Sequence, residues 1–408
     1  MRIAKKALSL MLTFCMVLSL AVNITAAEPA AKSGTSDVLL KIVHLDAGRK
    51  YFDVDSIKEI IDTMSESGYN ALELAVGNDG MRFLLDDMGL IVGDQTYSSK
   101  EVKAAIQQGN REYADFETNE LTESEMDAVI QYAANKGISI IPLINTPGHM
   151  DAILSAMTQL GVSNAAYHNS ERTIDVTNED AKDFTLAFVK KYIDYFSANG
   201  CQIFNMGADE YANDVYTSGG MGFGQLRSQG QYDDFLQYVN AMAAQIKEAG
   251  MKPMAFNDGI YYGCDTSAGT IDTDILIAYW TSGWSGYDVA SASFLAEQGF
   301  ELVNTNGDYY WIIGGSQCSA EKAEGFKVNS FMGENSALDA AGAMFCIWSD
   351  VPKAMTSQEA VQKVKSVITA FGNALSTDEE TNPDVPNSSQ AIEIAAGESA
   401  TITIPNED

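Results

Sequence analysis

Two hydrophobic patterns alternate along the chain. Short apolar runs, typical of buried strands, are followed by longer stretches in which apolar residues recur every three or four positions, as in an amphipathic helix. The short runs predict eight strands, at residues 39–45, 70–76, 138–144, 201–206, 252–256, 274–279, 300–304 and 341–347. The helical spacing predicts helices at residues 54–67, 121–136, 178–199, 232–249, 287–298 and 357–375.

The regular order of strand and helix predicts a parallel sheet. Eight units in series predict a (β/α)8 TIM barrel, an α/β fold that we place at residues 38–375. The helix at 121–136 opens with Thr122 and Glu125, the residues of a capping box, and stops at Gly137. The segment 77–119 is interpreted as a long inserted loop.

The two ends of the chain depart from this pattern. Residues 1–27 carry basic side chains, then an apolar run and small residues, which predicts a signal peptide and a secreted protein. No later stretch of the sequence is apolar enough for a membrane span. Residues 376–390 have the composition of a linker, and residues 391–408 alternate apolar and polar positions, which predicts a short β-rich tail or a truncated module.

Composition narrows the choice of partner. The chain has 56 acidic residues against 25 basic ones and a formal net charge of −31. Such a field repels phosphates, so it argues against nucleic acid and suits a neutral ligand such as a sugar. The four cysteines after the predicted signal peptide are widely spaced, without a metal-ligand pattern, and are interpreted as buried thiols with a disulfide left open: Cys201, Cys264, Cys318 and Cys346.

Residues that follow the strands of a barrel converge at one end of it. In this chain they are Asp46 and Arg49, Asn78 and Asp79, His149, Asp209 and Glu210, Asp258, Trp280, Tyr309 and Tyr310, and Trp348 and Asp350. Carboxylates supply acid chemistry, an arginine with carboxylates binds hydroxyls, and tryptophans pack on the apolar face of a ring. The set predicts a glycan pocket without metal or cofactor. Trp284 and Trp311 are interpreted at least equally well as core residues.

Five stretches carry a resemblance to a known family: HLDAGRKYFDVDSIKEIID at 44–62, IPLINTPGHMDAIL at 141–154, NMGADE at 205–210, NTNGDYY at 304–310 and FCIWSD at 345–350. In these motifs the chain resembles family 20 glycoside hydrolases, the β-N-acetylhexosaminidase and lacto-N-biosidase group. The stretches occur in family order across nearly the whole barrel. AVGNDGMRFLLDDM at 75–88, and the lack of the usual N-terminal domain, resemble the branch with secreted bacterial exohexosaminidases and lacto-N-biosidases.

The resemblance implies a retaining, substrate-assisted mechanism, in which the acetamido group of the substrate replaces an enzyme nucleophile. Glu210 is then the general acid and base, and Asp209 binds the acetamido N–H. Tyr310, or else Tyr309, donates a hydrogen bond to the acetamido oxygen. Adjacent residues of a regular strand face opposite ways, so both acids serve one pocket only if the backbone leaves strand geometry near Ala208 or Asp209.

The resemblance assigns further residues to the terminal sugar. Arg49 and Asp350 match positions that bind ring hydroxyls, and Trp280 and Trp348 wall the acetamido methyl and the sugar face. His149 and Asp79 match a pair that tunes Glu210. Together these roles imply an enzyme that releases a terminal β-linked N-acetylhexosamine, or a lacto-N-biose unit, from a glycan.

The chain also departs from the family pattern close to the acids. Many members have His or Gly-Gly before the acid pair, where this chain has Asn205, Met206 and Ala208, and many have Asp where Asn145 stands. These changes affect the expected charge relay through His149 and the expected shape of the pocket. The acids themselves are intact.

Three other interpretations remain open at this stage. The first is a retaining glycosidase with two separate carboxylates, for which Glu73 or Asp258 supplies the second. Another is a carbohydrate-binding barrel that has lost catalysis, which intact Asp209 and Glu210 argue against. A purely structural extracellular domain leaves the aromatic and acidic residues at the strand ends unexplained.

Overall fold

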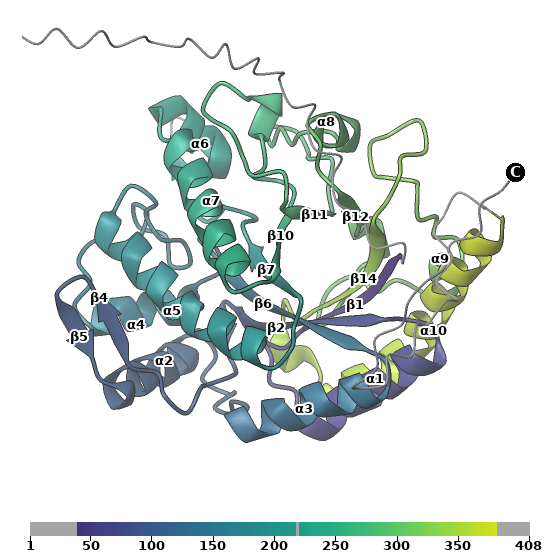
Figure 1. Ribbon diagram of the computed structural model, residues 1–408, viewed down its shortest axis with the longest axis horizontal. Helices are drawn as coiled ribbons and strands as arrows, with labels where there is room; N and C mark the ends of the chain where they lie inside the picture. Colours follow the sequence, from purple (N-terminus) through teal and green to yellow (C-terminus); the bar gives the residue numbers. More distant parts are fainter. Residues whose placement is uncertain (1–38, 218–219, 382–408) are drawn as a thin grey trace, which may run out of the picture. The chain divides into compact units, whose positions relative to one another are not determined.

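The computed structural model describes residues 39–217 and 220–381. The predicted signal peptide, the predicted β-rich tail and most of the predicted linker lie outside these ranges. Eight parallel strands pair in chain order, and β1 pairs with both β14 and β2, which closes a barrel (Figure 1). They are β1 (Leu40–Asp46), β2 (Ala71–Asn78), β6 (Ser139–Thr146), β7 (Ile203–Gly207), β10 (Lys252–Phe256), β11 (Leu276–Tyr279), β12 (Leu302–Asn304) and β14 (Gly342–Trp348). The predicted (β/α)8 fold is confirmed.

Helices surround these strands (Figure 1). Those that follow the strand pattern are α1 (Val54–Glu66), α3 (Glu123–Asn135), α5 (Glu179–Ala198), α7 (Tyr232–Glu248), α8 (Ala292–Glu297) and α10 (Ser357–Thr381). The capping box predicted for α3 is present, with Thr122 and Glu125 bonded to each other's backbone N–H. Helix α10 continues to Thr381, past its predicted end at residue 375. The connection from β10 to β11 carries only the 3-10 turn η1 (Tyr262–Cys264).

The prediction of a loop at 77–119 was wrong. This segment forms β3 (Gly80–Met81), a hairpin of β4 (Leu90–Val92) and β5 (Gln95–Tyr97), and helix α2 (Ser99–Tyr113). Ser98 and Glu101 close a capping box at the start of α2, a signal that the apolar pattern did not show. Helix α2 packs against α4 (Asp151–Gln159), which follows β6. The remaining helices are α6 (Gly222–Gln229) and α9 (Ala320–Ala323).

The strands separate two apolar regions. A large cluster lies between sheet and helices, and a smaller one fills the barrel, made by alternate residues such as Ile42, Met254 and Met344. Three polar side chains, His44, Glu73 and Asn205, are also fully buried. His44 Nδ1 lies 2.7 Å from Glu73 Oε1, and Asn205 Nδ2 donates to Glu73 Oε2 at 2.9 Å. Mutual hydrogen bonding makes this buried polar group tolerable.

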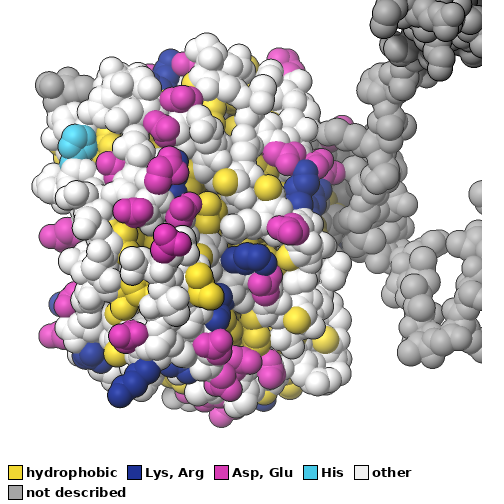
Figure 2. All heavy atoms as spheres, turned by 60° about the vertical axis from the view of Figure 1, so that its left-hand side comes forward, with side chains coloured by type: hydrophobic (Ala, Val, Ile, Leu, Met, Phe, Trp, Pro, Cys, Tyr) yellow, Lys and Arg dark blue, Asp and Glu magenta, His cyan; other side chains and the backbone are white. Residues whose placement is uncertain are grey.

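The surface follows the composition. Figure 2 shows carboxylates spread over one face among fewer Lys and Arg side chains, with small apolar areas between them. Among the described cysteines Cys201, Cys318 and Cys346 are buried, as predicted, whereas Cys264 is exposed, and all four are free thiols. None of the helices in the described part of the chain is long and apolar enough to cross a bilayer.

Close packing between α2 and α4 leads to a stability prediction. A Cβ atom on Gly109 would lie 2.2 Å from the carbonyl oxygen of Ala152, a backbone atom that cannot move alone. We expect Gly109→Ala to lower the free energy of unfolding by about 1–3 kcal/mol, the usual cost of overpacking. Urea unfolding measures it. Gly224→Ala is the matched control, because its Cβ has 3.8 Å of room, and it should be neutral or stabilising. Equal stability of both variants would contradict the packing argument.

Candidate active site

A cavity of about 460 Å³ opens at the carboxyl ends of the barrel strands. Small-molecule sites commonly have this size. Nine of the ten residues to which the family resemblance assigns a role line it: Arg49, Asp79, His149, Asp209, Glu210, Trp280, Tyr310, Trp348 and Asp350. The structure therefore brings together side chains that lie up to 301 positions apart in the chain.

Both acids reach this cavity because the backbone turns left-handed after β7. Gly207, Ala208 and Glu210 have φ of 79°, 67° and 48°, whereas a strand keeps φ negative. The predicted departure from strand geometry is confirmed. Each L-residue in this region costs about 1–2 kcal/mol, so neighbours must hold the turn in place. The Ala208 N–H donates to the Thr146 carbonyl at 2.9 Å, and the Glu210 N–H donates to Asp258 Oδ2 at 2.9 Å.

Only glycine fits at the start of this turn. A Cβ on Gly207 would lie 1.9 Å from Asn145 Oδ1. Asn145 in turn donates from Nδ2 to Asp209 Oδ1 at 2.8 Å and so fixes that carboxylate. Burial raises the pKa of Asp209, as does the charge of Glu210, while His149 and the Asn145 hydrogen bond oppose the shift. A neutral amide at position 145 therefore favours the ionised form of Asp209.

His149 links the second acid to a fixed charge. Its Nδ1 lies 2.9 Å from Asp79 Oδ1 and its Nε2 lies 3.2 Å from Glu210 Oε2. Burial alone would lower the pKa of His149, but Asp79, Glu210 and Asp209 raise it well above its ordinary value. Burial would raise the pKa of Glu210, but the hydrogen bond and charge of His149, together with the charges of Arg49 and Arg172, lower it. These directions favour the imidazole over the carboxylate as the position of the shared proton.

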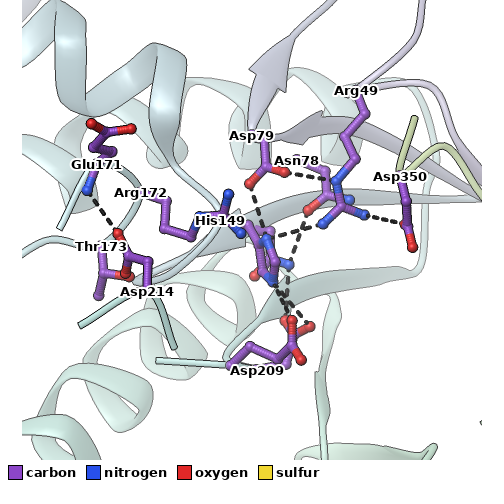
Figure 3. A network of polar contacts seen from close by, with 12 residues as sticks. Arg49, Asn78, Asp79, His149, Glu171, Arg172, Thr173, Asp209, Asp214 and Asp350 are labelled. Carbon is purple, nitrogen blue, oxygen red and sulfur yellow. Dashed lines mark hydrogen bonds and ion pairs between the residues drawn. The ribbon is translucent and has the colours of Figure 1, made fainter. Parts of the chain in front are cut away.

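Arg49 anchors the opposite side of this network. Figure 3 shows its guanidinium between Asp79 and Asp350. Nε donates to Asp79 Oδ2 at 2.7 Å, and Nη1 lies 3.4 Å from Asp350 Oδ1. Burial favours the neutral form of Asp79, but Arg49 and His149 hold the pKa of Asp79 well below its usual value. Asp350 keeps half of its side chain exposed and so presents oxygens to a ligand.

Three aromatic rings form the apolar wall. Trp280 lies nearly parallel to Tyr310, with ring centroids 6.5 Å apart, and Tyr310 meets Trp348 edge-on at 5.8 Å. The Tyr310 hydroxyl is buried and forms no hydrogen bond within the described ranges. Its neighbours Thr305 and Cys346 bond to each other at 3.1 Å. An unpartnered buried hydroxyl is available to a ligand atom.

Comparisons with known proteins identify relatives of this chain. The sequence profile of the glycosyl hydrolase family 20 catalytic domain matches residues 41–381. The chain belongs to glycosyl hydrolase family 20. It is 26% identical over 218 residues to a lacto-N-biosidase of Bifidobacterium bifidum, a match that covers 51% of this chain and 18% of that protein. It is 20% identical over 286 residues to a β-hexosaminidase of Vibrio furnissii, covering 66% and 43%. The chain thus spans less than half the length of these curated relatives.

Solved structures are similar to this chain over most of the barrel. A structure described for the tandem family 20 catalytic modules of the pneumococcal exo-β-D-N-acetylglucosaminidase StrH is 40% identical, with a TM-score of 0.78 and 83% of each chain covered. Dispersin B is 22% identical with a TM-score of 0.64, covering 82% of this chain and 99% of its own. That second likeness shows the common fold.

One predicted residue of this glycoside hydrolase domain lies elsewhere. Tyr309 packs edge-on against Phe326 and Phe371, at 5.1 and 6.4 Å between ring centroids, instead of lining the cavity. Its neighbour Tyr310 takes the position facing the cavity, because the chain leaves the 3-10 turn η2 (Gly307–Tyr309) between them. We therefore correct the expectation that Tyr309 binds substrate. Trp311 is buried, as interpreted from the sequence, whereas Trp284 is 45% exposed.

Neither proposed second carboxylate faces the cavity. Glu73 is fully buried within the barrel, bonded to His44 and Asn205. Asp258 is fully buried next to the left-handed turn at residues 207–210, which we call the acid turn. Its Oδ2 also accepts a hydrogen bond from the Tyr287 hydroxyl at 2.7 Å, and its Oδ1 accepts one from Trp280 Nε1 at 3.2 Å. Asp258 thus joins the backbone of the acid turn to the aromatic wall. Its place weighs against the two-carboxylate interpretation.

Sequence reasoning missed four other residues that line the cavity, Tyr113, Arg172, Phe256 and Ile312, whereas Asn78 lies there as expected for a residue at a strand end. Phe256 ends a correctly predicted strand, so its position was a usable signal. Tyr113 ends α2, which was taken for a loop, and Arg172 lies in a connection without periodic pattern. Figure 3 shows Arg172 pointing toward His149. Near it Asp151, which was also missed, has a pKa raised to about 8 by burial and by the charge of Asp79.

His149, Asp209 and Glu210 bring one potential metal-ligand atom each to within 4.8 Å of one another. The chemistry of this trio does not suit a cation. A protonated imidazole whose two nitrogens both donate to carboxylates has no free lone pair for a metal. The arrangement suits proton transfer between Glu210 and an atom in the cavity.

The buried carboxyl of Asp258 makes stability depend on pH. Burial, and then the charge of Asp209, raises the pKa of Asp258 from 3.8 to about 7. The native state therefore holds a proton that the unfolded chain releases, so this group costs stability as pH rises from about 4 to about 7. We expect the free energy of unfolding of Asp258→Asn, relative to the unsubstituted chain, to increase across that window.

Urea unfolding at several pH values measures this effect. Tyr287→Phe is a matched variant, because it keeps the carboxyl and removes a hydrogen bond that lowers the pKa of Asp258. Tyr287→Phe should therefore extend the pH range over which the free energy of unfolding falls to higher pH. A difference in the free energy of unfolding between Asp258→Asn and the unsubstituted chain that stays constant with pH would contradict this explanation.

Proposed function

We propose that this family 20 hydrolase removes a terminal β-linked N-acetylhexosamine from glycans, with retention of configuration, by using the acetamido group of the substrate as nucleophile. The observation that carries the proposal is the left-handed turn that aims two adjacent acids, Asp209 and Glu210, at one cavity with a phenol opposite. A separate nucleophile would require another free carboxylate about 5 Å from the acid. Asp79 is already paired with Arg49 and His149, and Asp258 is turned away.

Each group has one task in the first step. Glu210 gives its proton to the glycosidic oxygen as the bond from that oxygen to the anomeric carbon breaks. The acetamido carbonyl oxygen attacks the anomeric carbon and forms a cyclic oxazolinium ion. Asp209 accepts a hydrogen bond from the acetamido N–H, which gains positive character, and the Tyr310 hydroxyl donates a hydrogen bond to the acetamido oxygen and holds it in place. In the second step Glu210 takes a proton from a water molecule whose oxygen attacks the anomeric carbon. The bond from that carbon to the acetamido oxygen breaks, which opens the oxazolinium ring and restores the acetamido group.

The proton for the first step comes from the shared position between His149 and Glu210. Before substrate binds, this proton resides on the imidazole, and a substrate that excludes water from Glu210 favours its transfer to the carboxylate by desolvation. Asp79, held by Arg49, keeps the imidazole oriented throughout. On this view His149 stores the proton, while the neutral Asn145 leaves Asp209 ionised.

The remaining polar groups select the sugar. Arg49 and Asp350 lie where ring hydroxyls of the terminal sugar would bind, and sites built for hydroxyls discriminate strongly because unpaired buried polar groups are costly. Likeness at 40% identity to the pneumococcal exo-β-D-N-acetylglucosaminidase favours N-acetylglucosamine as the released sugar. We also propose that the protein is secreted by way of residues 1–27. The predicted partner is therefore an extracellular glycan.

The activity can be tested with nitrophenyl β-N-acetylglucosaminide, β-N-acetylgalactosaminide and lacto-N-bioside. We expect release from the first, and a loss of about 10²–10⁴-fold in kcat/KM for both Asp209→Asn and Glu210→Gln. Asp339→Asn, an exposed carboxylate outside the site, serves as control and should keep full activity. A thiazoline analogue of the oxazolinium ion should inhibit. Folded protein that binds these glycosides and cleaves none would favour a sugar-binding barrel instead.

Removing the imidazole should move the pH profile in a defined direction. His149 lowers the pKa of both Asp209 and Glu210. In His149→Asn the pKa of Asp209 rises, so the acidic limb, set by ionisation of Asp209, should shift to higher pH. The basic limb, set in the unsubstituted chain by loss of the proton that His149 and Glu210 share, should shift to lower pH, because the imidazole with its raised pKa no longer holds that proton. Initial rates from pH 4 to 9 measure this shift. A basic limb that shifts to higher pH in His149→Asn would exclude His149 as the group that stores the proton.

A further inference from the structure

One carboxyl group close to His149 takes no part in the proposed mechanism. Asp151 is the first residue of α4, and its Oδ2 is buried without a hydrogen-bond partner within the described ranges. Two backbone hydrogen bonds hold this segment against Asp79. The Asp79 N–H donates to the His149 carbonyl at 2.6 Å, and the Ala152 N–H donates to the Asp79 carbonyl at 2.8 Å. A buried carboxyl oxygen beside another carboxylate needs either a donor or a proton of its own.

The charged and titratable groups that face Asp151 come from four segments. Asp79 follows β2, His149 follows β6, Arg172 lies in the connection between α4 and α5, and Tyr113 ends α2. Arg172, His149 and the positive end of the α4 dipole favour the ionised carboxyl. Burial and the charge of Asp79 oppose ionisation, and these two larger effects raise the pKa of Asp151 to about 8. Asp151 therefore keeps its proton at neutral pH.

The acceptor for this proton is the carboxylate of Asp79, which shares a hydrogen bond with Asp151. Asp79 has room for a third donor. Its Oδ1 already takes His149 Nδ1 at 2.9 Å and its Oδ2 takes Arg49 Nε at 2.7 Å, but each carboxylate oxygen has two lone pairs. Two ionised carboxylates in contact would repel each other, so a proton between them allows them to lie together.

We propose that Asp151 is a positioning residue: its protonated carboxyl donates a hydrogen bond to Asp79 and thereby weakens the hold of His149 on its proton. This inference rests on the proposed function, because that proton is the one Glu210 delivers. While Asp151 is neutral, Asp79 divides its negative charge between two donors besides its arginine. When Asp151 releases its proton to solvent, a second negative charge stabilises the imidazolium and holds the proton back from Glu210.

The histidine rings give a direct readout that needs no substrate, because the chain has only three histidines. Nitrogen-15 NMR distinguishes a protonated ring from a neutral one. We expect the His149 ring signals to change near pH 8 while the ring stays protonated, since Asp151 ionises there. In Asp151→Asn this step should be absent, and the imidazolium should lose its proton at a lower pH than in the unsubstituted protein. His168, which bonds to Gln225 instead, is the internal reference.

Two further variants identify the group behind the step. Tyr113→Phe removes the neighbouring phenol and should leave the step at the same pH. Arg172→Gln removes a charge that lowers the pKa of Asp151, so the step should move to higher pH. This shift decides the matter if Asp151→Asn does not fold. The proposal is overturned if the unsubstituted protein shows no step, if the step persists in Asp151→Asn, or if Arg172→Gln leaves it in place.

Initial rates connect the carboxyl to the reaction. The ratio of kcat at about pH 9 to kcat at about pH 7 should be about three- to tenfold higher in Asp151→Asn than in the unsubstituted protein, which corresponds to a change of up to about one unit in the pKa of the imidazole. Equal ratios would reject the positioning role even if the NMR step is present. If neither protein cleaves any glycoside, the proposed function fails. The NMR step then still decides whether Asp151 shares its proton with Asp79.

Discussion

The site depends on one constrained piece of backbone, the left-handed turn from Gly207 to Glu210. In a regular strand Asp209 and Glu210 would face opposite sides of the barrel wall, and only one could reach the cavity. Positive φ at three of these four residues brings both carboxylates to the same side. The turn is unfavourable by itself, so the surrounding structure holds it through Thr146, Asn145 and Asp258, each from a neighbouring strand or its end. The chemistry we propose follows from that geometry, because the two acids reach different atoms of one sugar.

A buried layer of polar side chains inside the barrel connects the left-handed turn to strands β1 and β2. Asn205 accepts from the Gly207 N–H at 2.9 Å through Oδ1 and donates to Glu73. Glu73 bonds to His44, whose ring lies 4.1 Å from that of Trp348. In this layer His44 lies on β1 and Asn205 lies on β7. The layer thus spans β1, β2 and β7 and ends on a side chain of the cavity.

The sequence predicted the parts of this structure that are periodic or lie at strand ends. Eight apolar runs specified the barrel, and the residues after them include Arg49, His149 and Asp209, which the fold brings together. Helix α2 was not predicted because it is polar and because its start is marked only by a local capping box. Arg172 escaped because irregular connections have no period. Which of Tyr309 and Tyr310 faces the cavity depends on a 3-10 turn of a few residues. The exposure of Trp284 depends on a loop with two glycines. Neither feature follows from the hydrophobic pattern.

The central claim is that the nucleophile belongs to the substrate and that Asp209 and Tyr310 only hold it. Nitrophenyl glycosides whose N-acetyl group carries none, one, two or three fluorine atoms test it most directly, because fluorine withdraws electrons from the carbonyl oxygen and weakens it as a nucleophile. The account predicts a steep, progressive fall in kcat/KM with each fluorine. Values that remain level across the series would contradict it, since an enzyme carboxylate acting as nucleophile would be insensitive to that substitution.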